Sequence, residues 1–105
     1  MADFHEKLQA TIDDTITRLL GESVHEILQE HLIKEYDLTP DKIPYRLDTF
    51  VEILDNVFGV AGSRTIGWAI AWDFSAKIGL RFVESANFRL QDYLAQVKKT
   101  IAIHD

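Results

Sequence analysis

Residues 62–78, with the sequence GSRTIGWAIAWDFSAKI, decide the fold, because this segment is apolar around most of a helical circumference. Its apolar side chains form two stripes at helical spacing, which comprise Ile66, Ile70, Phe74 and Ile78 on one side and Trp68, Ala69, Trp72 and Ala76 on the other. A helix of this kind is usually buried on several sides. We therefore predict that it lies at the centre of an all-α bundle, that Gly79 ends it, and that Gly67 lets a neighbouring helix approach closely.

Two amphipathic helices are predicted at the beginning of the chain. Residues 2–20 carry an apolar residue every three or four positions, and Gly21 is the expected stop. A second helix is predicted to start at once after Gly21 and to fade near Asp37, and Ser23 has the spacing of a capping box with Glu26. Its inward stripe is expected to comprise Val24, Ile27, Leu28, His31 and Leu32.

A third helix is predicted to follow a proline-containing turn. Pro44 cannot lie in a hydrogen-bonded helix interior, so one short turn is expected at residues 40–43. The helix then starts at Pro44 or Tyr45 and stops at Gly59. Its water-facing side is expected to carry Asp48, Glu52 and Asp55.

The end of the chain predicts one more helix after a linker. Residues 80–84 are expected to be extended, and the last helix to start near Ser85 or Asn87. The sequence therefore predicts a single helical domain over residues 1–105, an all-α bundle of about five helices joined by short loops.

The amino-acid composition excludes several classes of functional site. The 105 residues include no cysteine, which excludes disulfides, zinc knuckles, iron–sulfur clusters and thiol catalysis. No apolar run approaches the ~18 residues of a membrane span, and the acidic N-terminal stretch does not resemble a signal peptide. We therefore expect no membrane association, with the cytoplasm as the default location.

Charge is distributed unevenly along the chain. Residues 1–55 contain 13 acidic and 5 basic residues, whereas residues 56–105 contain 4 acidic and 6 basic ones. An acidic first half repels phosphate, and the bases of the second half form no dense cluster. Direct nucleic-acid binding is therefore not expected.

Two histidines are candidates for catalysis or metal binding. His31 lies in the predicted inward stripe with Glu35 one turn later, so it is a carboxylate-oriented base, a pH switch or, as we favour, a partly buried histidine satisfied by its neighbour. Glu22 and His25 have the Glu-x-x-His spacing of di-iron bundles, but the single copy points away from the predicted core. We expect no metal, no cofactor and no catalytic set.

Charged side chains on two helices suggest contacts instead. Glu22, Glu26 and Glu30 form an acidic stripe that could attract a cation or a basic partner, although a solvated helix face is the favoured interpretation. Asp73 lies on the most apolar helix and needs a partner there. We expect it to form a structural ion pair with Lys77, Arg18 or Arg64 rather than to act as an acid in catalysis.

Trp68 and Trp72, four residues apart, are the most informative aromatic pair. They could form a partner surface or line a ligand pocket, because tryptophan is enriched at interfaces. Packing in the core is the favoured alternative, since a helix this apolar has little reason to face water.

A set of structural residues carries a resemblance to a known family. The set comprises Leu19-Leu20-Gly21, His31-Leu32, Tyr36, Ile43-Pro44, Phe50, Leu54, Phe58-Gly59, Gly62, Lys77 and Gly79-Leu80. Over residues 18–100 the chain resembles a small archaeal helical domain of unknown function, one of the Nitrosopumilus output domains appended to signalling proteins. The resemblance implies a compact helical module, standing alone or at the output end of a receiver-type protein, and no catalytic residues.

Two functions of different classes follow from these observations. The first is a non-catalytic interaction or signalling-output module that acts through helix faces on a protein partner or on a second copy of the chain as a homodimer. The alternative is a small-molecule sensor in which Trp68, Trp72 and His31 line an apolar pocket between helices.

Overall fold

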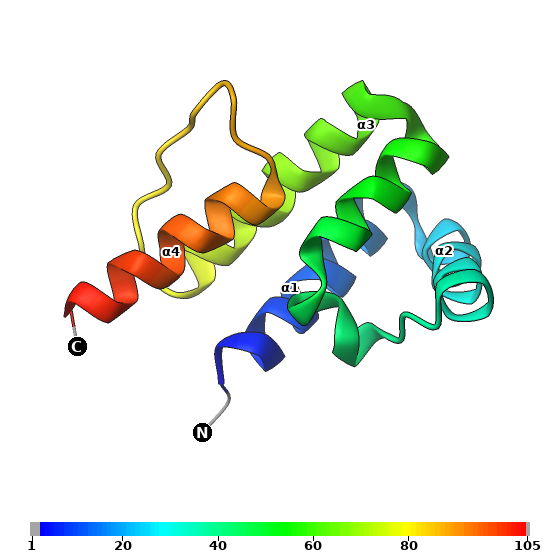
Figure 1. Ribbon diagram of the computed structural model, residues 1–105, viewed down its shortest axis with the longest axis horizontal. Helices are drawn as coiled ribbons and strands as arrows, with labels where there is room; N and C mark the ends of the chain where they lie inside the picture. Colours follow the sequence, from blue (N-terminus) through cyan, green and yellow to red (C-terminus); the bar gives the residue numbers. More distant parts are fainter. Residues whose placement is uncertain (1–2, 105) are drawn as a thin grey trace.

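The computed structural model describes residues 3–104, with side chains to residue 102, and shows an all-α fold (Figure 1). The helices are α1 (Phe4–Leu20), α2 (Glu22–Tyr36), the short 3-10 helix η1 (Pro40–Tyr45), α3 (Leu47–Lys77) and α4 (Leu90–His104). Gly59 has non-helical angles, φ 78° and ψ 162°, so α3 consists of two helical parts that meet at a kink. The predicted five-helix, all-α architecture is confirmed.

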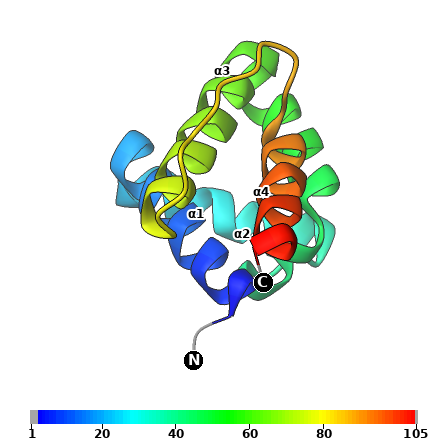
Figure 2. The ribbon, with the colours of Figure 1, turned by 90° about the vertical axis from the view of Figure 1, so that its left-hand side faces the viewer.

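Helix α3 is central, as the apolar segment predicts. It packs against α1 on one side and α4 on another, while α2 packs mainly against α1 (Figure 2). The core between these helices is closed by large side chains that are at most 2% exposed, among them Leu8, Ile12, Leu32, Phe50, Leu54, Ile70, Phe74, Leu90 and Leu94. No helix within residues 3–104 is both long and apolar enough to cross a membrane.

Glycines end the helices where predicted. Gly21 follows α1 and Gly59 divides α3, and both have positive φ and a ψ of 162°. This region of backbone space is essentially confined to glycine. Gly79, with φ 75°, follows α3. The prediction for Gly67 is also confirmed, because a Cβ built at this position lies 3.3 Å from the Cβ of Leu90 at the start of α4.

The predicted starts of α3 and α4 are wrong by a few residues, whereas α2 starts at once after Gly21 as predicted. Helix α2 begins at Glu22 directly after Gly21, and no side chain caps it, so the capping box of Ser23 does not form. The turn of residues 40–43 is confirmed but extends through Pro44 to Tyr45, which delays α3 to Leu47.

The start of α4 is later than predicted because its cap lies at Arg89. The Arg89 amide donates to the Asp92 carboxylate at 2.8 Å, an arrangement that satisfies a free N–H at the helix start. Ser85 and Asn87 therefore belong to a loop, residues 78–89, that runs along α3 and α4 before the chain turns into α4 (Figures 1 and 2).

Helix α2 is rotated relative to the predicted orientation. Leu28 and Leu32 are buried as expected, but Val24 is 38% exposed and Ile27 is 65% exposed. The half-buried side of the helix includes His25 instead. The predicted inward stripe is therefore only partly correct, because α2 rests mainly on α1 and leaves one apolar edge uncovered.

Candidate functional site

Trp68 and Trp72 lie on the surface, so the favoured prediction of core packing is wrong. Their side chains are 37% and 50% exposed, and their rings stack with centroids 5.5 Å apart. The helices α1 and α4 cover other sides of α3, and the indoles lean against Phe82 of the loop, with centroids 5.9 and 5.3 Å from its ring. A single aromatic side chain covers the two indoles only in part.

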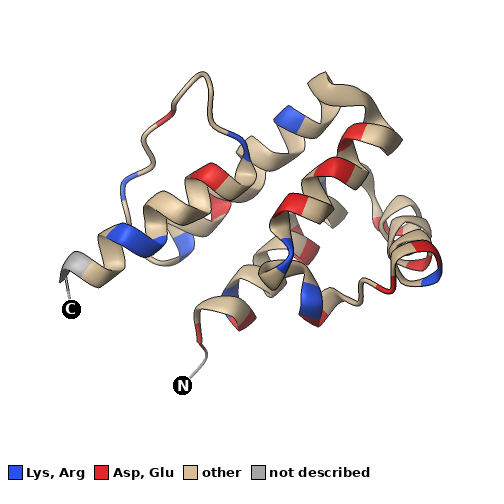
Figure 3. Ribbon diagram, viewed as in Figure 1, with Lys and Arg blue, Asp and Glu red and all other residues tan. Residues whose placement is uncertain are grey.

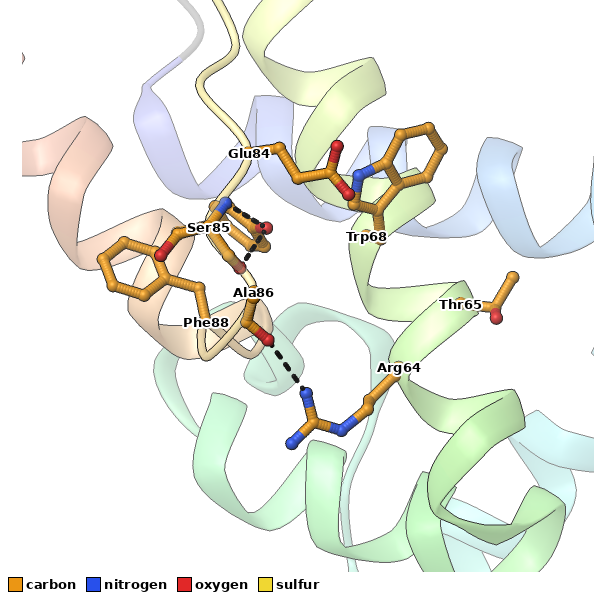
Figure 4. Close-up of a pocket in the computed structure, with 8 residues that line it drawn as sticks. Arg64, Thr65, Trp68, Glu84, Ser85, Ala86 and Phe88 are labelled. Carbon is orange, nitrogen blue, oxygen red and sulfur yellow. Dashed lines mark hydrogen bonds between the residues drawn. The ribbon is translucent and has the colours of Figure 1, made fainter.

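The loop of residues 78–89 is fixed by specific contacts. The Tyr93 hydroxyl donates to the Ser85 carbonyl and accepts from the Ser85 amide, both at 3.1 Å. Arg64 reaches from α3 to the Ala86 carbonyl at 3.5 Å, across a depression that Trp68 also lines (Figure 4). Phe82 packs against the Tyr93 ring at 5.1 Å. These contacts hold the loop on the surface of α3 and α4 without regular secondary structure.

The uncovered edge of α2 continues onto α3 as an apolar surface. We define the α2 patch as Val24, Ile27, His31, Val57 and Phe58, which line one depression of about 280 Å³ with Leu28 among its walls. Val57 is 46% exposed. Monomeric proteins rarely leave several large apolar side chains together in water without a function, so the α2 patch is the strongest candidate for a binding surface.

His31 belongs to this patch and not to the core. It is exposed, and its ring meets Tyr36 edge to face at 5.7 Å. Within the described residues it makes no hydrogen bond or ion pair with Glu35, so the predicted pair is absent. His31 and Trp68 line different depressions, and the predicted shared pocket of Trp68, Trp72 and His31 does not form.

The two helices that form the α2 patch also carry exposed acidic side chains, at positions outside the patch. Glu22, Glu26 and Glu30 are exposed on α2, as predicted. Figure 3 shows further acidic positions along the first part of α3, where Asp48 and Glu52 are exposed. Among the described side chains, Lys34 forms an ion pair with Glu30, with 3.6 Å between the Lys34 Nζ and the Glu30 Oε1. None of these carboxylates lines the depression itself.

His25 and Glu22 do not form a metal site with other residues. The His25 side chain is only 15% exposed and points to α1, where its Nε2 lies 3.3 Å from the Asp13 carboxylate. Burial raises the pKa of Asp13, and the hydrogen bond to His25 offsets part of this rise. The expectation that His25 points away from the core is wrong. No cluster of three or more metal-binding side chains occurs in the part of the chain that the structure describes.

Asp73 forms the structural contact that its position predicts. Its carboxylate accepts from Arg18 at 2.6 Å and from the buried Thr15 hydroxyl at 2.7 Å, both on α1. Of the three predicted partners, Arg18 is therefore correct. Lys77 pairs with Asp14 at 3.5 Å. Arg64 contacts the loop instead.

The half-buried ion pair between Asp55 and Arg89 was not predicted. Asp55, expected to face water, accepts from Arg89 at 2.5 Å, and the two side chains are 26% and 19% exposed. Arg89 also donates to Ser63 at 3.2 Å, so it joins both parts of α3 to the start of α4. No pattern in the sequence indicates this contact, because it depends on the kink at Gly59, which brings residues 55 and 63 to the same arginine.

Asp55 should make folding stability sensitive to acid. Hydrogen bonding from Ser63, and then from Arg89, holds the pKa of Asp55 below its ordinary value. Its carboxylate therefore stabilises the fold at neutral pH, and this stabilisation is lost as the pH falls below about 4. We expect Asp55→Asn to lower the free energy of unfolding by about 1 kcal/mol at pH 7, since the pair is partly solvated. The variant should also lose less stability than the parent chain when the pH falls below about 4.

Urea unfolding between pH 3 and 7 measures this effect. Asp48→Asn, at an exposed position of the same helix, is the matched control. If the two variants lose stability equally and show the same pH profile, the role assigned to Asp55 is wrong.

Comparisons with known proteins leave the resemblance to the Nitrosopumilus output domains an untested prediction. No protein-family model, curated protein or solved structure gives a significant match to this chain.

Proposed function

We propose that this chain is a non-catalytic interaction module that binds a protein partner through the α2 patch. The observation that carries the proposal is the rotation of α2, which places Leu28 in the core and leaves Val24 and Ile27 in water beside Val57. Burying exposed apolar side chains of this size supplies the main free energy of most protein association. The resemblance to an output domain supports the same class of function.

Charge indicates the chemistry of the partner. The chain has a net charge of −6, and exposed acidic side chains lie on α2 and on the first part of α3, the two helices that form the patch (Figure 3). A basic amphipathic helix suits this arrangement, because its apolar face can enter the depression while its positive charge is attracted by the net negative charge of the chain. A second copy of the chain carries the same net negative charge, so a different partner is favoured over a homodimer.

A synthetic helical peptide with one leucine face and lysine flanks provides a defined probe. We expect it to shift the NMR signals of the Ile27 and Val57 methyl groups in a saturable manner. Ile27→Ser should weaken binding about tenfold, because a buried aliphatic side chain contributes more than 1 kcal/mol.

Ile33→Ser is the matched control, since Ile33 is 43% exposed on α2 but does not line the patch. Unchanged binding by Ile27→Ser, or shifts spread over all acidic surfaces, would mean that the peptide binds by charge alone. Equal weakening in both variants would mean that the patch is not its specific site, and each of these results would refute the proposal. Light scattering over a concentration series tests the homodimer. A dimer that Ile27→Ser dissociates would make a second copy the occupant of the patch.

The alternative function, a small-molecule sensor built from Trp68, Trp72 and His31, has no support from the geometry. The two indoles lean on Phe82, whereas His31 lies in the α2 patch.

A further inference from the structure

The loop of residues 78–89 encloses a second cavity on its α4 side, separate from the α2 patch. This cavity has a volume of about 380 Å³, which falls within the range of small-molecule sites. Its apolar walls include Leu80, Phe82, Phe88 and Val97. The contacts of Tyr93 with Ser85, and of Phe82 with the two indoles, fix the loop and so preform the cavity.

Two polar groups in this cavity lack partners. Arg81 is the one residue with a full charge among those that line it, and none of the ion pairs among the described residues involves it. Ser75 is only 4% exposed and also lines the cavity. Its hydroxyl takes part in no hydrogen bond found in the described part of the chain, whereas the nearby Thr100 hydroxyl donates to the Gln96 carbonyl.

Among the described residues, Gln91 Oε1 is the one fully buried side-chain polar atom that lacks a partner, so the Ser75 hydroxyl is open to the cavity, where it can hydrogen-bond water or a ligand atom. An unpaired guanidinium in an acidic protein favours an anion, and it matches the geometry of a carboxylate. The remaining walls are apolar and aromatic, which suits a hydrocarbon or aromatic body.

We propose that this cavity binds a small monocarboxylate with an aliphatic or aromatic body. Arg81 pairs with the carboxylate at the cavity mouth, the body lies between Phe82, Phe88 and Val97, and the Ser75 hydroxyl hydrogen-bonds a polar atom of the ligand. The proposal does not depend on the α2 patch, because none of these residues belongs to that surface.

The test uses the full chain with octanoate and 3-phenylpropanoate as probes and their neutral amides as controls. Trp68 and Trp72 report on binding because both indoles contact Phe82, which is part of the cavity wall. We expect a saturable change in tryptophan emission with both acids, together with NMR shifts at Tyr93 and Val97. The amides should bind at least tenfold more weakly.

Variants locate the site. Arg81→Gln should weaken binding of the acids about tenfold and should fold normally, since Arg81 is exposed. Arg46→Gln removes the same charge from an exposed position outside the cavity and should leave the affinity unchanged.

Three results would overturn the proposal: no saturation at millimolar acid, equal binding of acid and amide, or equal effects of the two arginine variants. Ile27→Ser should leave these titrations unchanged. Failure here is therefore distinguishable from failure of the α2 patch to bind its peptide probe.

Discussion

Gly67→Val is expected to destabilise the fold by about 3 kcal/mol, at the upper end of the usual cost of overpacking. A Cβ at Gly67 would lie 3.3 Å from the Leu90 Cβ and 3.6 Å from the Leu90 amide nitrogen. Leu90 is 1% exposed and begins α4, so neither atom can move aside without shifting the helix. Valine adds two further methyl groups at this contact. Its better helix propensity than glycine recovers only a few tenths of a kcal/mol.

A shift of α4 caused by Gly67→Val should also disturb the loop of residues 78–89, because Tyr93 of α4 donates a hydrogen bond to the Ser85 carbonyl. Thermal or urea unfolding measures the stability, and red-shifted emission of Trp68 would report loosening of Phe82 from the indole. Ala76→Val, at an exposed position of α3, is the control and should cost only about 0.5 kcal/mol through helix propensity. Similar losses in both variants would show that α4 does not need the glycine.

Gly59→Ala is expected to destabilise the fold by about 2 kcal/mol. Gly59 has φ 78° and ψ 162°, a region that costs an L-residue roughly 1–3 kcal/mol. No atom lies within 4 Å of a Cβ built there, so the cost comes from the backbone and not from crowding. If the helix straightened to relieve this strain, Asp55 and Ser63 would no longer meet the same arginine, Arg89.

D-alanine at position 59, introduced by chemical ligation, separates backbone strain from crowding by the added methyl group. The observed angles are the mirror image of an extended conformation that L-residues adopt freely, so the D-residue should fold at least as stably as the parent chain. Urea unfolding of the two alanine forms gives the comparison. Equal stability of the L and D forms would show that the kink is not what the glycine provides.

Local features were predictable because they depend on neighbours in sequence. Gly21, Gly59 and Gly79 end or divide helices because only glycine takes these positive φ values at little cost. Asp73 needed a cation because a carboxylate on an apolar helix cannot remain unpaired, and Arg18 was among the three candidates.

The candidate sites were harder to predict than the helices. Hydrophobic periodicity shows that α2 has an apolar side, but Ile27 and Leu28 both belong to it, and packing on α1 decides which of them is buried. The same limit applies to Trp68 and Trp72. An apolar helix surface can be covered by a helix or by one aromatic residue of a loop, and the sequence does not distinguish these cases.

By itself, the sequence determined the helical class, the central position of residues 62–78, the glycine breaks and the close approach at Gly67, because periodicity and backbone freedom are properties of short segments. Only the tertiary structure decided which face of α2 remains in water, and that Asp55 meets Arg89 across 34 residues. It also decided that the loop encloses a cavity with Arg81 at its edge. These features depend on how helices rotate and cross, which is set by the sum of many contacts between distant residues.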